Sequence, residues 1–181
     1  MEIEVKVRID NLPKLKKDIE KLGSTWSATQ TQVDAYYKYK DDVNAVQRPG
    51  SFILRIRRDN RAKLTFKAFT DRRGVWEEYE TVVSDPEALE KMLEKSGFIK
   101  VLTLHKRRTS SKYQHFSLEI DEIEELGDFL EAEVMGDDGE KLQEEIKQFF
   151  LSLGLSPDKI DRRGYPEMIF EDRGQKFEGQ S

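Results

Sequence analysis

The chain has 181 residues, of which 37% are charged and 36% hydrophobic, and its formal net charge is -5. This length suits one domain with a sizeable core, and the acidic balance argues against general affinity for nucleic acid or for an anionic membrane. The absence of cysteine excludes disulfides and thiolate metal sites. No apolar run approaches the roughly 18 residues of a membrane span, and the N-terminus lacks a signal-peptide profile, so we expect a cytoplasmic protein.

Residues 1–9 alternate apolar and charged side chains without a break, which is the period of a strand with two unlike faces. The charged face carries Glu2, Glu4, Lys6 and Arg8. A strand with one core side and one solvated side is the simplest interpretation of this stretch alone. The same pattern recurs along the chain, so the charged faces need a common explanation.

The next segment has the signals of a helix followed by a long strand. Asn11 can cap a helix that has Pro13 in its first turn and ends at Gly23. Residues 25–39 then predict a strand, and residues 41–51 predict a loop because they contain Asp, Asn, Pro and Gly.

Three further strands are predicted at 52–58, 63–69 and 75–83, and their short connections favour antiparallel neighbours. Each again carries charges on one face. These charges are Arg55 and Arg57 on the first strand, Lys63 and Lys67 on the second, and Glu78 and Glu80 on the third.

The second half of the chain repeats this order. Ser84 to Glu87 is a capping-box signature for a helix that ends at Gly97. Strands are predicted at 98–109, 113–121 and 128–135, and their polar faces carry Lys106, Arg108, Glu119, Asp121, Glu131 and Glu133. A helix over 139–153 and a short helical turn over 165–170 follow. We therefore expect one domain over 1–171 and a polar, disordered tail over 172–181.

The charged faces decide between an open sheet and a closed barrel. An open sheet would expose the charges, whereas a closed eight-stranded barrel turns one face toward a lumen that has room for side chains or one small ligand. Because the helices need the apolar face, the charged face should line the interior. Dry burial of so many ions would cost several kcal/mol each, so we expect a wet lumen that holds a charged ligand. The predicted fold class is α+β, a closed eight-stranded antiparallel barrel with helices packed outside.

The two kinds of charge indicate the chemistry. Arginine and lysine at alternate positions on several strands can surround a polyanion, and arginine makes bidentate contacts with phosphate oxygens. Paired carboxylates without histidine or cysteine form an oxygen site suited to Mg²⁺ or Mn²⁺. Cations for phosphate beside carboxylates for its metal ion form the arrangement that phosphoryl transfer needs.

The opening Glu2-x-Glu4-x-Lys6 resembles the ExExK signature of the CYTH superfamily, the triphosphate tunnel metalloenzymes. That superfamily includes class IV adenylyl cyclases, thiamine triphosphatases and inorganic triphosphatases. The resemblance continues in order over roughly residues 1–170, through Gln32-x-Asp34-x-Tyr36, Leu54-Arg55-Ile56-Arg57, Lys67, Glu78-x-Glu80, Lys106-x-Arg108, Asp121, residues 127–133 and Gly164-Tyr165. Two positions depart from it: His105 stands where a polar residue is frequent, and Gly164-Tyr165 stands where Ser-Tyr is frequent.

The resemblance implies a tunnel fold and a role for each charged residue. The implied metal ligands are Glu2, Glu4, Asp121, Glu131 and Glu133. The implied substrate-binding residues are Lys6, Arg8, Arg55, Arg57, Lys67, Lys106 and Arg108, with Lys6 and Lys106 as candidate electrostatic stabilisers of the reaction. Glu78 and Glu80 are grouped with the substrate-binding residues, and three roles stay open for them. They could bind a second metal ion, position water or the base, or only balance charge.

Three functions fit this pattern: two enzymes that act on a triphosphate and a non-catalytic sensor of polyphosphate or a nucleotide. The expected partner is a nucleoside or inorganic triphosphate. The first, favoured by the compact chain and its Gly127-to-Glu131 segment, is a class IV adenylyl cyclase that converts ATP to cyclic AMP and pyrophosphate. The second is a triphosphate hydrolase of the inorganic or thiamine triphosphatase type. The third, a sensor without catalysis, predicts lost metal ligands, whereas the acidic set here is intact. We expect a monomer or a homodimer that binds neither nucleic acid nor a membrane.

The Arg72-Arg73 and Arg162-Arg163 pairs are typical of solvated loops, and a place at the mouth of the tunnel is the alternative.

Overall fold

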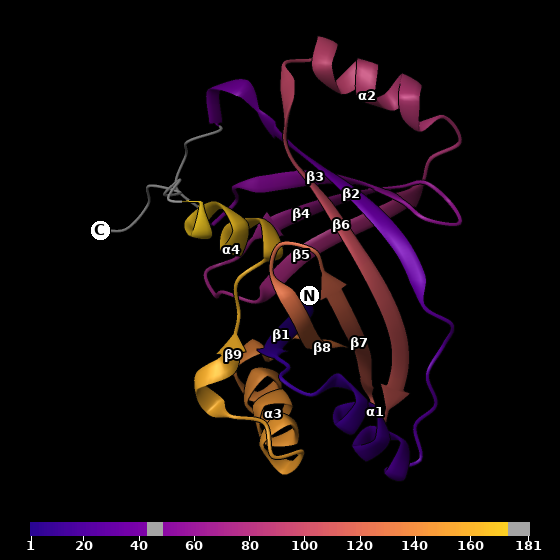
Figure 1. Cartoon of the computed structure of the whole chain (residues 1–181). Coiled ribbons are helices and arrows are strands. Elements are labelled where there is room, and N and C mark those ends of the chain that lie inside the picture. The colour runs from indigo at the N-terminus through magenta and orange to yellow at the C-terminus, as the bar shows by residue number, and fades with distance from the viewer. Residues whose placement is uncertain (43–48, 174–181) are drawn as a thin grey trace. The chain divides into compact units, whose positions relative to one another are not determined.

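The structure is a computed structural model that describes residues 1–42 and 49–173 (Figure 1). Its strands are β1 Glu2–Arg8, β2 Gln30–Tyr39, β3 Phe52–Arg58, β4 Lys63–Phe69, β5 Val75–Val82, β6 Phe98–Tyr113, β7 Phe116–Ile123, β8 Gly127–Met135 and β9 Ile160–Asp161. Its helices are α1 Leu12–Lys21, α2 Pro86–Lys95, α3 Gly139–Ser152 and α4 Tyr165–Asp172, with short 3₁₀ turns η1 Lys40–Asp42 and η2 Pro157–Lys159.

The hydrogen-bonded strand order is β5-β4-β3-β2-β6-β7-β8-β1-β9. The predicted fold class, a closed eight-stranded antiparallel barrel accompanied by helices, is confirmed, and β9 is an additional strand that the sequence pattern did not predict. No helix within residues 1–42 and 49–173 is long and apolar enough to cross a membrane.

The chain divides into two compact units. The first contains residues 1–31 and 106–163, and the second contains residues 32–105 and those from Gly164 onward. The predicted domain boundaries, 1–171 and 172–181, stay predictions. Most of the predicted loop (43–48) and most of the predicted tail (174–181) lie outside the described residues.

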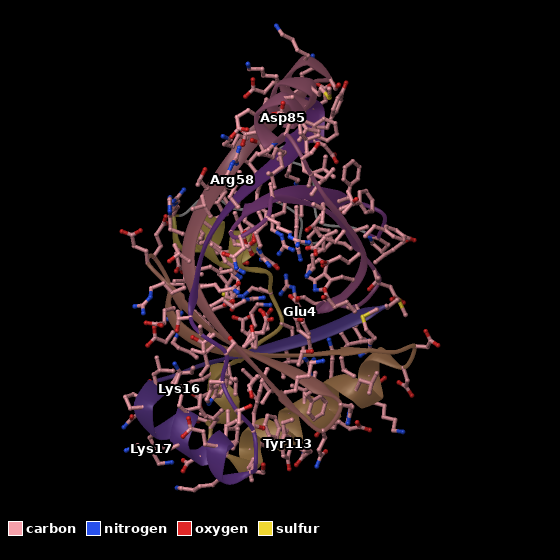
Figure 2. All side chains as sticks on the ribbon, turned by 90° about the vertical axis from the view of Figure 1, so that its right-hand side faces the viewer. Glu4, Lys16, Lys17, Arg58, Asp85 and Tyr113 are labelled. Atoms are coloured by element: carbon pink, nitrogen blue, oxygen red, sulfur yellow. The ribbon has the colours of Figure 1, made fainter. Side chains whose placement is uncertain are left out.

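In the first unit, β1 and β7 flank β8 in antiparallel ladders, and strand alternation separates an apolar face from a charged one. The apolar face buries Ile3, Val5, Leu118 and Leu130 completely, and α3 packs against β1. Burial of each such side chain contributes about 1.5–3 kcal/mol. Figure 2 shows Lys16 and Lys17 of α1 at the outside of this unit, while Glu4 lies on the side of β1 that is turned away from α1. Because the apolar side chains of these strands are buried on one face, the charged side chains that alternate with them lie together on the opposite face.

In the second unit, β2, β3, β4 and β5 form one antiparallel meander. Its apolar face contributes Ala35, Tyr37, Leu54 and Ile56 to a buried cluster that Leu93 of α2 completes. The opposite face of the meander carries the charged residues of the predicted site, Arg55, Arg57, Lys67, Glu78 and Glu80.

The largest differences from the predicted strand boundaries are at the start of β2 and at the turn between β6 and β7. β2 begins at Gln30 and not at residue 25, because the Ser27 hydroxyl accepts a hydrogen bond from the Ser110 backbone N–H at 3.0 Å and so replaces a ladder carbonyl. The turn expected at residues 110–112 lies instead at Gln114 and His115, where Gln114 adopts a φ of 53°. Glutamine is not among the residues that favour turns with a left-handed backbone, so the sequence did not predict a turn at this position.

Candidate active site

The charged face of the first unit brings acidic and basic side chains together by strand register. Glu4 of β1 lies opposite Glu133 of β8, and Lys6 lies opposite Glu131. Glu119 of β7 lies opposite Glu131 on the other side of β8. Residues directly opposite in antiparallel strands place their side chains on the same face, so these charges are neighbours.

Lys6 lies between two carboxylates. Its Nζ donates to Glu4 Oε1 at 2.6 Å and lies 2.9 Å from Glu131 Oε2. The lysine is only 1% exposed, and both carboxylates are buried as well. A buried ammonium with two charged acceptors is held rigidly, because leaving either partner unpaired would cost several kcal/mol.

Glu4, Glu131 and Glu133 form a three-carboxylate group whose ligand oxygens all lie within 4.8 Å of one another. Carboxylate oxygens at this spacing are the donor set of a hard divalent cation, so the residues fit a metal ion of the Mg²⁺ or Mn²⁺ type. Of the five predicted metal ligands, the structure brings these three together. Glu2 lies opposite Met135 near the start of β1, and Asp121 contacts Lys106 together with Arg108, the cation that also contacts Glu131.

The three-carboxylate group contains two carboxyls in unlike electrostatic environments. Burial alone would raise the pKa of Glu131, but Lys6 and Arg108 hold that pKa well below its usual range. Burial and the adjacent Glu131 raise the pKa of Glu133 well above its usual range. A bound divalent cation would favour the charged form of both, because it supplies the positive charge that Glu133 lacks.

Arg108 is held by three carboxylates. Its Nε donates to Asp121 Oδ1 at 2.6 Å, its Nη2 donates to Glu131 Oε1 at 3.2 Å, and its Nη1 pairs with Glu119. Lys106 Nζ donates to Asp121 Oδ2 at 3.1 Å. Burial raises the pKa of Asp121, but Arg108 and Lys106 together bring it below its usual range. Both predicted substrate-binding cations of β6 therefore carry carboxylate partners in the ligand-free protein.

Arg8 lies apart from this cluster. It is exposed, its guanidinium carbon is 4.7 Å from the centroid of the Phe129 ring, and its Nη1 donates to the Leu126 carbonyl. Stacking on an aromatic face fixes an arginine without neutralising it, so Arg8 is placed to meet an anion from solvent.

The second unit holds its own ionic cluster. Arg57 makes a bidentate pair with Asp34, with Nε to Oδ1 at 2.8 Å and Nη2 to Oδ2 at 2.9 Å, and Asp34 is completely buried. Tyr36 follows on the same face of β2, where burial raises the pKa of its phenol to about 12. The phenol is therefore neutral at physiological pH and can donate a hydrogen bond.

Arg55 and Lys67 lie close to Glu78 and Glu80, the two glutamates on the charged face of β5. Arg55 Nη2 donates to the Thr65 hydroxyl at 3.0 Å and lies 3.7 Å from both Glu78 Oε1 and Glu80 Oε2. Lys67 Nζ lies 3.2 Å from Glu78 Oε2 and 4.9 Å from the centroid of the Trp76 ring. Among the alternatives for Glu78 and Glu80, these contacts agree best with balancing charges.

The structure also reveals site residues to which the sequence analysis gave no role. Asp34, Thr65 and Glu119 each contact a predicted substrate-binding cation. Their positions on the charged faces were visible in the alternation, but their partners depend on cross-strand register. The prediction that Glu4 and Arg55 face one cavity joins residues of the two units and stays a prediction.

The chain belongs to the CYTH family, because the sequence model of the CYTH domain family matches residues 1–165. This match contains both ionic clusters.

Three relatives extend the comparison. The Methanocaldococcus jannaschii protein MJ0240, named a candidate adenylate cyclase, is 30% identical over 174 residues, which is 93% of this chain and 98% of that protein. The solved structure of PH1012 from Pyrococcus horikoshii has a TM-score of 0.79 and 30% identity, and covers 91% of this chain and 97% of its own. HpAC1 from Hippeastrum, a candidate adenylyl cyclase described as having a dominant triphosphatase activity, has a TM-score of 0.64 and 19% identity, over 99% of this chain and 100% of its own.

Proposed function

We propose that this protein is a divalent-metal-dependent enzyme that acts on a triphosphate, with conversion of ATP to cyclic AMP and pyrophosphate as its reaction. The observation that carries the proposal is the three-carboxylate group beside the buried Lys6. A metal site and a phosphate-binding cation share one charged face. The name of the M. jannaschii relative supports the cyclase reaction.

Glu4, Glu131 and Glu133 would hold the metal ion, and Glu2 and Asp121 are the remaining proposed ligands. The bound ion would neutralise phosphate charge and polarise the reacting phosphorus–oxygen bonds. The three carboxylates must all be charged for this, and the raised pKa of Glu133 means that metal binding displaces a proton from its carboxyl.

The cations bind and orient the triphosphate by exchanging partners. Lys106 and Arg108 now contact Asp121, and a phosphate oxygen offers the same charge-assisted hydrogen bonds as a carboxylate oxygen. In the cyclase reaction the ribose 3′-hydroxyl gives up its proton to water as its oxygen attacks the α-phosphorus, the bond from that phosphorus to the bridging oxygen breaks, and pyrophosphate leaves. Lys6 and Lys106 would stabilise the charge that develops on the departing pyrophosphate.

Triphosphate hydrolysis is the second candidate function. It is favoured by the contacts of the three-carboxylate group, because Glu4 pairs with Lys6 and Glu131 pairs with Lys6 and Arg108, so neither carboxylate is placed as a base for a ribose hydroxyl. HpAC1 is an example of a protein with a cyclase name and a dominant triphosphatase activity. A sensor without catalysis is less well supported, because the acidic set is complete.

The product of the reaction distinguishes these functions. We would incubate the protein separately with ATP, inorganic triphosphate and thiamine triphosphate, each with Mg²⁺ and with Mn²⁺, and identify the products by chromatography. The proposal predicts cyclic AMP and pyrophosphate from ATP. Release of inorganic phosphate from any of the three identifies a hydrolase, and no turnover of any of them would refute the proposed function.

A further inference from the structure

Gln32 brings an uncharged amide to the charged face of the second unit. Strand register pairs Asp34 of β2 with Arg57 of β3, and Gln32 lies two residues before Asp34 on the same face of β2. Gln32 is buried, with only 4% of the residue exposed. Lys63 lies opposite Arg57 on β4, and its side chain is 37% exposed, so a ligand in solvent can reach this end of the face.

One carboxylate fixes the orientation of the Gln32 amide. Its Nε2 donates to Asp59 Oδ2 at 3.2 Å, and Asp59 Oδ1 accepts from the Arg61 backbone N–H at 3.1 Å. An ionised carboxylate only accepts hydrogen bonds, so the amide nitrogen and not the amide oxygen faces Asp59. The other end of the amide is therefore the acceptor Oε1.

Gln32 Oε1 is buried and has no hydrogen-bond donor among the residues that the structure describes. Leaving a buried acceptor unsatisfied costs about 1–3 kcal/mol, so this oxygen favours a ligand that offers an N–H or O–H group. A metal-bound triphosphate does not offer one, because its oxygens accept hydrogen bonds. The hydroxyl and amino groups of a nucleoside do.

We propose that Gln32 is a specificity-determining residue whose Oε1 accepts a hydrogen bond from the nucleoside part of the substrate. The inference rests on the proposed function and deepens it, because Gln32 would distinguish a nucleoside triphosphate from inorganic triphosphate. The two sources of the donor are the ribose hydroxyls and the 6-amino group of adenine, a group that glutamine also recognises in DNA.

Gln30 provides a matched control. It is the same residue type, two positions before Gln32 on β2, but it is exposed. If the loss of any amide from this strand weakened binding, substitutions of Gln30 and Gln32 would have equal effects. A specific contact requires that only Gln32 matter.

The test is calorimetric titration of the full chain in Mg²⁺ with two probes that cannot be turned over. One is bis(methylene)triphosphonate, and the other is the ATP analogue that has methylene groups at both bridging positions, so the two differ only by the nucleoside. We expect Gln32→Leu to weaken binding of the ATP analogue by about tenfold and to leave that of the triphosphonate within about twofold of the wild type. Gln30→Leu should change neither affinity by more than about twofold.

Three variants of the ATP analogue identify the donor, because each lacks one group: the 6-amino group, the ribose 2′-hydroxyl or the ribose 3′-hydroxyl. The one that lacks the donor should bind the wild-type protein about tenfold more weakly than the parent analogue does, and Gln32→Leu should not weaken it further. If Gln32→Leu weakens all three as much as the parent analogue, the inference is refuted.

The outcomes separate this inference from the proposed function. If the wild-type protein binds neither probe, the proposed function fails. If it binds both, and Gln32→Leu weakens both equally or weakens neither, then Gln32 does not contact the nucleoside and only the inference fails. Melting curves without ligand show whether Gln32→Leu is folded. If it is not, Gln32→Met provides the same comparison, because it keeps the length of the side chain without the amide.

Discussion

At the scale of single residues, the candidate site consists of charges that differ in how well each is compensated. Glu131 contacts Lys6 and Arg108, whereas the adjacent Glu133 is the carboxyl whose pKa is raised. Two carboxylates at this distance repel one another unless a cation lies between them. In the ligand-free protein the raised pKa keeps a proton on Glu133, and a bound metal ion would take the place of that proton.

This asymmetry predicts opposite effects of two similar substitutions on stability. Glu133→Gln should raise the free energy of unfolding by about 1 kcal/mol in EDTA at pH 7, because glutamine removes the cost of protonating this carboxyl on folding. Glu131→Gln should lower it by about 1.5–3 kcal/mol, because Lys6 and Arg108 lose a charged acceptor. Both should lose divalent-dependent turnover, as should Glu4→Gln. Urea denaturation with and without Mn²⁺ measures the effects, and equal stability changes in the two variants would contradict the assignment.

Arg57 and Arg58 are neighbours in sequence, and substituting each of them tests whether an arginine of β3 binds the triphosphate or only stabilises the fold. Arg57 pairs with the buried Asp34, while Arg58 donates to Glu90 of α2 at 2.9 Å. We expect Arg57→Ala to weaken triphosphonate binding by about ten- to a hundredfold and also to lower stability by about 3–5 kcal/mol, since it leaves Asp34 without its bidentate partner.

Arg58→Ala should lower the melting temperature without changing the affinity, because Arg58 lies on the face of β3 that carries Leu54 and Ile56 and pairs there with Glu90 of α2. Lys106→Ala and Arg107→Ala form an equivalent pair, since Lys106 contacts Asp121 and Arg107 contacts Glu122. Titrations and ligand-free melting curves of all four variants separate the two roles. Affinity that survives in Arg57→Ala and Lys106→Ala while stability falls would show that these cations are purely structural.

At the scale of elements, the helices follow their capping signals with one shift. The sequence pattern Ser84 to Glu87 predicted a capping box, but the structure has Asp85 as the N-cap of α2, with its carboxylate accepting from the Ala88 N–H at 2.9 Å. Pro86 then occupies the first helical position, where its missing N–H costs nothing. A carboxylate also interacts favourably with the positive end of the helix dipole, which explains why Asp85 replaces Ser84 as the cap.

The cap assignment predicts that Asp85→Ala lowers the free energy of unfolding by about 1 kcal/mol, whereas Ser84→Ala changes it by less than about 0.5 kcal/mol. Chemical denaturation of both variants measures this difference. A larger loss for Ser84→Ala than for Asp85→Ala would support the original capping box and not the structure.

At the scale of the whole molecule, much of the fold could be predicted because its strands alternate strictly. The ranges predicted for β3 and β4 match the structure, and every predicted helix is present. The two-residue β9 was missed because two residues cannot display a period. The additional length of β6 was missed because Ser110 and Ser111 resemble turn residues, although they are paired with Glu119 and Leu118.

The candidate site could be predicted as a set of residues but not as a set of contacts. Alternation placed Lys6 and Arg57 on charged faces, and the family resemblance supplied their expected roles. Register then determines which carboxylate each cation meets, and it depends on pairing between strands that are far apart in sequence. The partnership of Arg57 with Asp34 could therefore be found only in three dimensions.

The central claim, that the protein binds a triphosphate through a metal ion and several cations, is tested most directly by one calorimetric comparison. The full wild-type chain is titrated with bis(methylene)triphosphonate and with methylenediphosphonate, each in Mg²⁺ and in EDTA. We predict saturable binding at one site per chain, at least about tenfold tighter for the triphosphonate than for the diphosphonate, and weakened when Mg²⁺ is removed. Equal affinity for the two phosphonates, or binding that does not depend on Mg²⁺, would contradict the account.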